Sequence, residues 1–226
     1  MSKDQYEAFM QRAEKQLTPD KFGKSTVMNI YLDTPSFLLI RNSIDAKGYK
    51  EKLRIRSYGV PDDNARVFFE IKKKHKGIVY KRRIDLPYQK VLDYIYRGEK
   101  PCNSQIMQEI DYAMKFYGNP LPRAVVSYER EAYFWSDDET VRLTFDKNVR
   151  YRTEDNDLIS GSYGTEIIPR NAVLMEVKTA GAMPLMLSSI LNECNIFPTS
   201  FSKYGKAYMH YMTTSQNNQT KKEQLI

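Results

Sequence analysis

The sequence predicts an α+β fold: an antiparallel β-barrel with flanking helices. Several short segments alternate apolar and charged residues with the period of two that is typical of strands in a half-buried sheet. The charged positions of these segments are mainly Lys and Arg, whereas a solvent-facing sheet surface normally mixes charges of both signs. A barrel interior lined with so many cations requires an anion. We therefore expect a barrel that binds a phosphate polymer or a triphosphate.

The composition indicates a globular protein with a polyanionic partner. The chain of 226 residues is 41% hydrophobic and carries a net charge of +7, from 35 Lys and Arg against 28 Asp and Glu. Cys102 and Cys194 form no CxxC pair and histidines do not cluster, so neither a disulfide framework nor a zinc site is indicated. No apolar stretch approaches the roughly 18 to 20 residues of a membrane span. We expect a cytoplasmic chain without a transmembrane segment.

The first predicted elements are a helix and a strand. Apolar residues recur at helical spacing over residues 5–17, and residues 18–20 follow as a stop signal. Residues 27–32 are mostly β-branched, aromatic or aliphatic and end at a turn over residues 33–35.

Three alternating strands follow. Their ranges are 52–58, 67–72 and 79–86, and Lys76-Gly77 is typical of a hairpin turn between the last two. The charged residues that share one face are Lys52, Arg54 and Arg56 in the first strand, Glu70 and Lys72 in the second, and Lys81 and Arg83 in the third.

Helices and further strands complete the chain. Helical spacing predicts helices over residues 87–97, 104–117, 184–194 and 202–211, with Gly98 and Gly118 as C-terminal caps of the first two. Strands are predicted over residues 123–135, 140–145 and 172–179, with a long loop or hairpin over 148–170. The polar residues 213–226 predict a disordered tail, which leaves one domain over residues 1–212.

The charged strand faces allow two interpretations. For any single strand, mixed Lys and Glu side chains are typical of a solvated outer face. The series as a whole places Arg54 beside Arg56 and repeats cationic positions in successive strands, which favours an interior that binds a polyanion. A carboxylate among these cations either pairs with a neighbouring Lys or Arg or holds a divalent cation with phosphate oxygens. We expect the pairing for Glu70 and the metal for Glu176.

Seven motifs in this order resemble the VTC domain. They are KLRIRSY from Lys52, FEIKKK from Phe69, VYKRR from Val79, SYEREAY from Ser127, VRLTFD from Val141, LMEVK from Leu174 and FSKY from Phe201. The VTC domain is the polyphosphate polymerase domain of the vacuolar transporter chaperone family, in the triphosphate tunnel metalloenzyme (CYTH-like) superfamily. The resemblance runs from about residue 29 to residue 211.

The resemblance implies a tunnel of antiparallel strands in which the γ-phosphate of ATP is transferred to a growing polyphosphate chain with Mn²⁺ or Mg²⁺. The tunnel-lining, catalytic cations correspond to Arg54, Arg56, Lys72, Lys81, Arg130, Arg142, Lys203 and Lys206. Of these, Arg54, Arg56, Lys72 and Lys203 are expected to contact the ATP, and Glu176 is expected to bind the metal. Arg82 or Arg83 is an alternative counterpart for Lys81. ATP and polyphosphate, or triphosphate and pyrophosphate, are the expected ligands, and a membrane-protein partner is compatible with the family.

Related domains begin with a strand rich in Glu and Lys before the first helix, whereas this sequence starts almost directly in that helix. We therefore expect the first tunnel strand to be missing, the barrel to be partly open, and activity to be affected.

Two other functions remain open from the sequence. A tunnel-fold triphosphatase would use water as the acceptor, and a non-catalytic module would bind polyphosphate or inositol phosphates through the cations without needing Glu176. Nucleic acid is not expected as a partner, because the aromatic residues mostly share strand faces with apolar residues and form no base-stacking platform.

Overall fold

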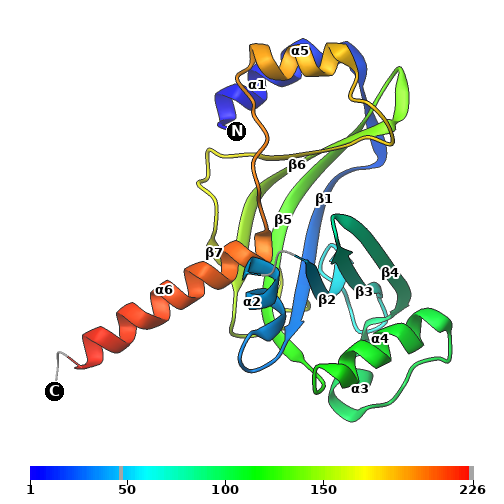
Figure 1. Cartoon of the computed structure of the whole chain (residues 1–226), viewed down its shortest axis with the longest axis vertical. Coiled ribbons are helices and arrows are strands. Elements are labelled where there is room, and N and C mark those ends of the chain that lie inside the picture. Colours follow the sequence, from blue (N-terminus) through cyan, green and yellow to red (C-terminus); the bar gives the residue numbers. More distant parts are fainter. Residues whose placement is uncertain (46–47, 224–226) are drawn as a thin grey trace. The chain divides into compact units, whose positions relative to one another are not determined.

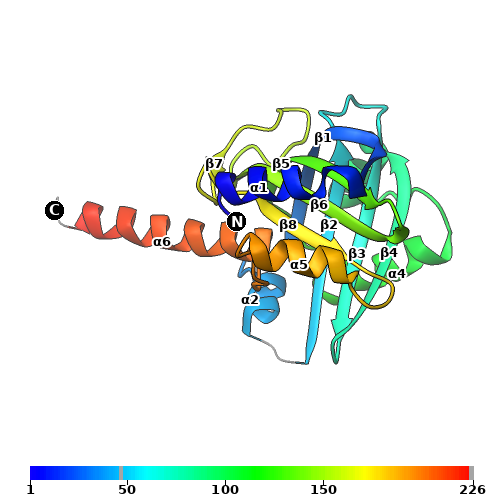
Figure 2. The same cartoon turned by 90° about the horizontal axis from the view of Figure 1, so that it is seen from above.

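The computed structural model describes residues 1–45 and 48–223. By residue contacts the chain falls into two compact units. Unit 1 comprises Met1–Thr26, Tyr128–Val149 and Ile168–Phe201, and unit 2 comprises Val27–Ser127, Arg150–Ile167 and Ser202–Ile226. The helices and strands of both are labelled in Figures 1 and 2. The expected boundary of one domain over residues 1–212 stays a prediction.

An antiparallel sheet is the main element of the described chain. Its strands are β1 (Leu17–Asp33), β2 (Tyr49–Tyr58), β3 (Arg66–His75), β4 (Ile78–Pro87), β5 (Leu121–Trp135), β6 (Asp138–Arg152), β7 (Thr165–Glu166) and β8 (Leu174–Lys178). The strand order is β4-β3-β2-β1-β5-β6-β7, and β8 also pairs with β6. The predicted α+β class with an antiparallel sheet and flanking helices is confirmed. In the described residues no pairing joins β4 to β7, so the sheet is not closed and the barrel is not confirmed.

The core of unit 2 lies between one sheet face and two helices. Ile55 on β2 is paired with Phe69 on β3, and both are fully buried. They pack with residues of α3 (Tyr88–Arg97) and α4 (Gln105–Phe116), which lie beside β3 and β4 in Figure 1. Because strand side chains alternate, this packing sends the intervening charged residues to the opposite face.

Helix ends in unit 2 follow their capping signals. Ser104 accepts a hydrogen bond from the Met107 backbone N–H and starts α4. Gly98 is left-handed, with φ of 74°, and ends α3. At the predicted hairpin, Lys76 and Gly77 both have positive φ, 46° and 86°, which is the backbone of a type I′ turn.

Unit 1 is built around its own core. Ser2 and Gln5 form a capping box at the start of α1 (Lys3–Ala13), which is followed by the 3₁₀ turn η1 (Glu14–Gln16). Helices α1 and α5 (Leu185–Glu193) lie side by side in Figures 1 and 2. Phe9 of α1 packs there against Phe145, at 5.8 Å between ring centroids.

Three elements differ from the sequence prediction. Strand β1 begins at Leu17, ten residues before the predicted strand, and accommodates Pro19 and Gly23, which resemble turn residues in sequence. The helix α2 (Leu38–Asp45) was not predicted. Helix α6 (Lys203–Glu223) continues through residues 213–223, where the sequence predicted a disordered tail, because an existing helix gains one backbone hydrogen bond for each added residue. Residues 224–226 lie outside the described residues.

Asp33 connects α2, β1 and α6 within unit 2. Its carboxylate accepts the backbone N–H groups of Leu39 and Ile40 and the hydroxyl of Tyr204, at 2.9 to 3.0 Å. Asp33 is fully buried, and this burial raises the pKa of its carboxyl despite these hydrogen bonds. The Tyr204 ring stacks on Tyr31 at 4.3 Å between centroids. The first turn of α6 is thereby fixed to the sheet.

No helix in residues 1–45 and 48–223 combines the length and apolar character that crossing a membrane requires.

We predict that Tyr204→Phe lowers the free energy of unfolding by roughly 1–2 kcal/mol, because a buried carboxylate loses a hydrogen-bond donor while the ring stack is kept. Tyr208→Phe is the control, because it also removes a tyrosine hydroxyl from α6 while it keeps the ring that packs on Phe37. Urea unfolding monitored by circular dichroism measures both. Equal stability of the two variants would contradict the role of the Tyr204 hydroxyl.

Candidate functional site

One face of β2, β3 and β4 in unit 2 carries a cluster of cations, here called the cationic face. Its members are Lys52, Arg54, Arg56, Lys72, Lys81 and Arg83. Residues that pair across antiparallel strands point to the same face, and Lys72 pairs with both Lys52 and Lys81. Three lysines thus lie in one row across three strands. Like charges in such positions repel one another.

One buried carboxylate lies among these cations. Glu70 is only 1% exposed, and its Oε2 accepts a hydrogen bond from Arg54 Nε at 2.6 Å, while Lys81 Nζ lies 2.7 Å from its Oε1. Burial acts to raise the pKa of Glu70, but Arg54, Arg56 and Lys81 outweigh it and lower the pKa. The expected pairing of Glu70 with neighbouring cations is therefore observed. One carboxylate neutralises only part of the charge of six cations.

Two lysines of the cationic face are partly removed from water. Burial lowers the pKa of Lys52, and Lys72 and Arg54 add to the effect. Burial also lowers the pKa of Lys81, although Glu70 acts in the opposite direction. A bound anion would favour the charged form of both lysines. The cationic face is thus arranged so that an anion stabilises it.

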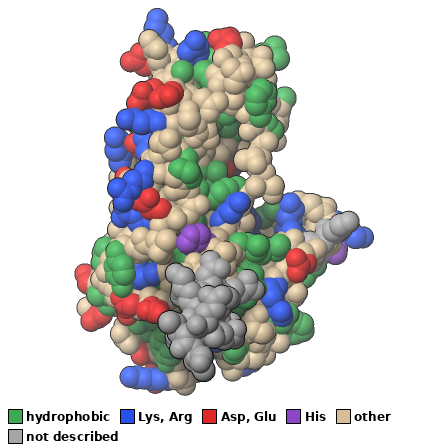
Figure 3. Space-filling model, turned by 90° about the vertical axis from the view of Figure 1, so that its left-hand side faces the viewer, with side chains coloured by type: hydrophobic (Ala, Val, Ile, Leu, Met, Phe, Trp, Pro, Cys, Tyr) green, Lys and Arg blue, Asp and Glu red, His purple; other side chains and the backbone are tan. Residues whose placement is uncertain are grey.

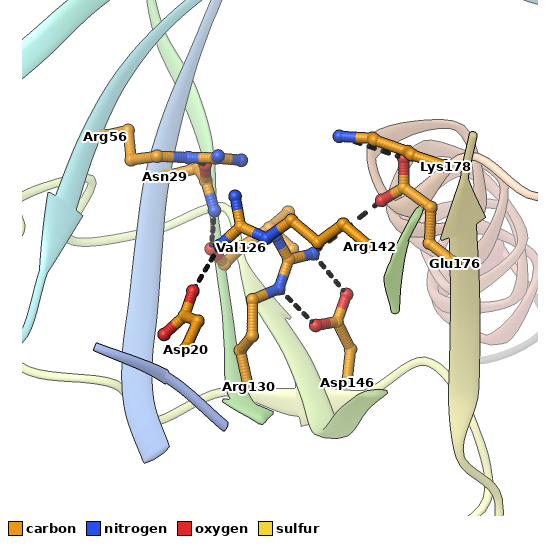
Figure 4. A network of polar contacts seen from close by, with 9 residues as sticks. All are labelled: Asp20, Asn29, Arg56, Val126, Arg130, Arg142, Asp146, Glu176 and Lys178. Atoms are coloured by element: carbon orange, nitrogen blue, oxygen red, sulfur yellow. Dashed lines mark hydrogen bonds and ion pairs between the residues drawn. The ribbon is translucent and has the colours of Figure 1, made fainter. Parts of the chain in front are cut away.

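Arg56 is held by a neutral side chain. Its Nε donates to Asn29 Oδ1 at 2.8 Å, and Asn29 in turn donates to the backbone oxygen of Val126 at 3.1 Å (Figure 4). Arg56 is 8% exposed. The amide fixes the direction of the guanidinium without neutralising its charge.

The polar face of β5, β6 and β8 in unit 1 carries a second network, here called the Arg130 network. Arg130 forms a two-pronged ion pair with Asp146, at 2.6 and 2.8 Å, and Asp146 is 1% exposed (Figure 4). Arg130 Nη2 also lies 4.0 Å from Glu176, which is 3.4 Å from Lys178 Nζ. Burial acts to lower the pKa of Arg130, but Asp146 outweighs it and raises the pKa.

Arg142 in unit 1 has a separate partner. Its Nη2 donates to Asp20 Oδ2 at 2.5 Å, and the guanidinium lies over the Phe134 ring at 5.7 Å. The Arg142 side chain is 41% exposed whereas Asp20 is 3% exposed. Arg142 can therefore contact a ligand without breaking this pair.

Glu176 is a candidate ligand for a divalent cation. Its side chain is 49% exposed and its ion pairs are long, whereas Asp146 is buried and held by both prongs of Arg130. Among the described residues no group of three or more His, Cys, Asp or Glu side chains could hold a metal ion. A single exposed carboxylate such as Glu176 fits an Mg²⁺ or Mn²⁺ ion that takes one carboxylate from the protein and its other oxygens from phosphate and water.

Lys203 and Lys206 lie in the first turns of α6, in unit 2. They are three residues apart and so share a side of the helix; Lys203 is half-buried and Lys206 is exposed. Lys52 Nζ donates to Ser202 Oγ at 2.9 Å, which brings the start of α6 to the cationic face.

The structure thus groups Arg54, Arg56, Lys72 and Lys81 in one cluster and Arg130 with Glu176 in another. Of the alternatives for Lys81, Arg82 points to the opposite face, where its Nε lies 3.3 Å from Glu109 of α4. Arg83 pairs with Glu70 across β3 and β4 and shares the face of Lys81, with its guanidinium over the Phe68 ring, so it remains an alternative. The polar partners Asn29 and Asp20 are not evident from the sequence. In sequence Asp20 resembles part of a helix stop. It lies in a strand because β1 starts at Leu17, earlier than the sequence predicts.

The basic side chains on the face drawn in Figure 3 do not form one separate patch. On the face drawn in Figure 3, Lys and Arg side chains lie beside Asp and Glu side chains. The cationic face is therefore distinguished by its composition and not by the net charge of the chain.

The sequence matches the family model of the VTC domain over residues 1–212. A search of curated proteins found no significant match. Among solved structures, a protein from Bacillus halodurans described as a putative adenylate cyclase is 15% identical, with a TM-score of 0.57 over 89% of each chain. A putative adenylyl cyclase from Hippeastrum, described as having a dominant triphosphatase activity, is 18% identical, with a TM-score of 0.55 over 89% of this chain and 88% of that chain. At these identities the two structures show a shared fold.

We predict that Glu70→Gln lowers the free energy of unfolding at pH 7 by roughly 2 kcal/mol, because Arg54 and Lys81 lose their common partner while keeping some contact with water. The control Glu109→Gln removes the exposed pair with Arg82 and should change stability by less than about 0.5 kcal/mol.

The difference between wild type and Glu70→Gln should also depend on pH. The folded pKa of Glu70 is lowered, so its stabilisation is complete above the unfolded value of about 4.3 and is lost as the pH falls through the folded value. Urea unfolding between pH 3 and pH 7 measures this. A difference that stays constant over that range would show that the charge of Glu70 contributes nothing.

Proposed function

Because the chain belongs to the VTC domain family, we propose that it is a metal-dependent polyphosphate polymerase that transfers the γ-phosphate of ATP to a growing polyphosphate chain. The observation that carries the proposal is the cationic face, where six cations surround one buried carboxylate and two lysines have lowered pKa values. Such a face is suited to a ligand that presents a row of negative charges. Triphosphates and polyphosphate both do so.

The proposed reaction needs no side-chain nucleophile. A terminal phosphate oxygen of the acceptor chain attacks the γ-phosphorus of ATP, the bond from this phosphorus to the β,γ-bridging oxygen breaks, and ADP leaves with that electron pair. The negative charge of the transferred group remains on its oxygens throughout. Positioning and charge neutralisation then supply most of the rate, and these are what arranged Lys and Arg side chains provide.

The cations have different roles in this proposal. Arg54 and Arg56 are fixed by Glu70 and Asn29 and can each bind two phosphate oxygens. Lys72 and Lys81 act as mobile point charges on flexible side chains. Arg54, Arg56, Lys72 and Lys203 are proposed to contact ATP. Arg130, Arg142 and Lys206 are proposed to contact other phosphate groups.

Glu176 is the proposed ligand of Mn²⁺ or Mg²⁺. When bound, the ion would neutralise phosphate charge and help to orient the transferred group. Its exposed carboxylate is free enough to reorient, because neither of its ion pairs is shorter than 3.4 Å. Closure of the sheet into a tunnel is also part of this proposal.

A tunnel-fold triphosphatase is the second candidate. The described triphosphatase activity of the Hippeastrum protein favours it, since that protein shares the fold. In that case water replaces the acceptor phosphate and the products are free phosphate and the shortened nucleotide or polymer. A non-catalytic module that binds polyphosphate or inositol phosphates is a third candidate and requires the cations alone.

We predict that the chain forms polyphosphate from ATP and Mn²⁺, and that Glu176→Ala lowers the rate on the order of 100-fold by removing a metal ligand. Polyphosphate and free phosphate are measured separately. Glu193→Ala on α5, which removes an exposed ion pair with Arg12 of α1, is the matched control and should keep full activity.

Free phosphate without polymer would identify the triphosphatase instead. Tight polyphosphate binding that is unchanged in Glu176→Ala, with neither product formed, would identify the binding module.

We also predict that Lys81→Ala weakens tripolyphosphate binding roughly 10- to 100-fold, because a charge-assisted hydrogen bond is lost and Glu70 is left with one partner fewer. Arg82→Ala removes the same charge from the next residue, which points to the opposite face, and should change affinity less than about threefold. Isothermal titration calorimetry gives both values.

Affinity in the wild type should fall as the pH rises, beginning below the ordinary lysine range, because the pKa values of Lys52 and Lys81 are lowered. Equal effects of Lys81→Ala and Arg82→Ala would show that the ligand does not bind to the cationic face.

A further inference from the structure

The hairpin between β3 and β4 has an unusual composition. Its residues 71–84, with the sequence IKKKHKGIVYKRRI, contain seven Lys and Arg residues and no Asp or Glu. The strands pair in register up to the turn, where His75 lies opposite Ile78. Both faces of the hairpin end are therefore basic.

The same hairpin end exposes large apolar side chains. Ile78 is 59% exposed, Val79 is 49% exposed and Tyr80 is 51% exposed. Tyr49, at the start of β2, is 45% exposed and packs edge-on against the His75 ring. These residues, together with Lys74 and Lys76, are called the hairpin tip below.

Folding alone does not account for the hairpin tip. Strand β4 ends the strand order of the sheet, and lysines on such an edge strand prevent pairing with other chains. This explains the lysines but not the exposed Ile78 and Val79, which would favour such pairing. The turn itself depends on the backbone of Lys76 and Gly77 and not on apolar side chains next to it.

We propose that the hairpin tip docks on the surface of a membrane that contains anionic lipids. Lysines near an anionic bilayer are attracted to the lipid headgroups, while aliphatic and tyrosine side chains enter the boundary between headgroups and acyl chains. The combination fits a lipid surface better than a soluble polyanion, because a phosphate chain offers no apolar region for Ile78 and Val79. Nucleic acid would bind through stacked aromatic rings and not through aliphatic side chains.

The proposal is independent of the function proposed above. Lys72 and Lys81 belong to the cationic face and are left unchanged in its test. Lys74, Lys76, Ile78 and Val79 have no assigned role in phosphoryl transfer, so variants at these positions should retain polymer formation or tripolyphosphate binding. Loss of docking and loss of catalysis are thus distinguishable.

The test is sedimentation of the full chain with vesicles of phosphatidylcholine alone or with one quarter phosphatidylserine. We expect binding to the anionic vesicles only. The charge variant Lys74→Gln/Lys76→Asn should weaken it roughly 30-fold, from two lysines at the surface. Asn is suited to the positive φ of residue 76, so the turn is kept. The apolar variant Ile78→Thr/Val79→Thr keeps β-branched residues and should weaken binding roughly tenfold.

Two controls complete the test. Lys3→Gln/Lys15→Gln changes the net charge equally in exposed residues of unit 1 and should bind like wild type. Tyr80→Trp places a fluorescent reporter in the hairpin tip, and its emission should shift to the blue on anionic vesicles, against the constant signal of Trp135, which is 1% exposed.

The proposal is overturned if the apolar variant binds like wild type and the emission of the Tyr80→Trp reporter does not shift, because the hairpin tip would then bind anions in solution without entering a membrane. It is also overturned if the Lys3→Gln/Lys15→Gln control loses as much binding as the charge variant.

Discussion

The arrangement of the cationic face depends on the buried carboxylate of Glu70. Its two oxygens contact Arg54 from β2 and Lys81 from β4, so one side chain on the middle strand holds together cations from both neighbours. Without a carboxylate at this position, the row of Lys52, Lys72 and Lys81 would repel across three strands with nothing to offset it. With it, the repulsion is reduced but not removed. The remaining positive charge is the basis on which we propose this face as a binding surface.

The opposite face of the same strands offsets the free-energy cost of this arrangement. Ile55 and Phe69 are fully buried against α3 and α4, and such burial stabilises the sheet by about 1.5–3 kcal/mol for each large side chain. Strand alternation links the two faces, because a register shift of one residue would send the cations into the apolar core. The apolar pattern therefore fixes the position of each cation. The proposed binding residues of this sheet are thus positioned by core residues on its opposite face.

Strand alternation also explains what the sequence could predict. The faces of residues 52–58, 67–72 and 79–86 follow from a period of two, so Arg54, Lys72 and Lys81 were assigned to one face without coordinates. Asp20 could not be assigned, because Pro19 and Gly23 conceal the first half of β1. Helix α2 was missed because Asp33, which accepts the backbone N–H groups of Leu39 and Ile40, resembles a turn residue in sequence. The continuation of α6 depends on a helix that starts upstream, and the polar composition of residues 213–223 does not show this.

The two polar networks handle charge in different ways, and the difference bears on their roles. In the Arg130 network a buried carboxylate, Asp146, occupies both prongs of the arginine, and this pairing raises the pKa of Arg130. On the cationic face burial lowers the pKa values of Lys52 and Lys81, which means that their charged forms are destabilised. A phosphate ligand therefore gains more from the lysines, because its negative charge offsets the burial and repulsion that lower their pKa values. Arg130 has less to gain from a phosphate, so we expect it to add less to ligand affinity than the lysines do.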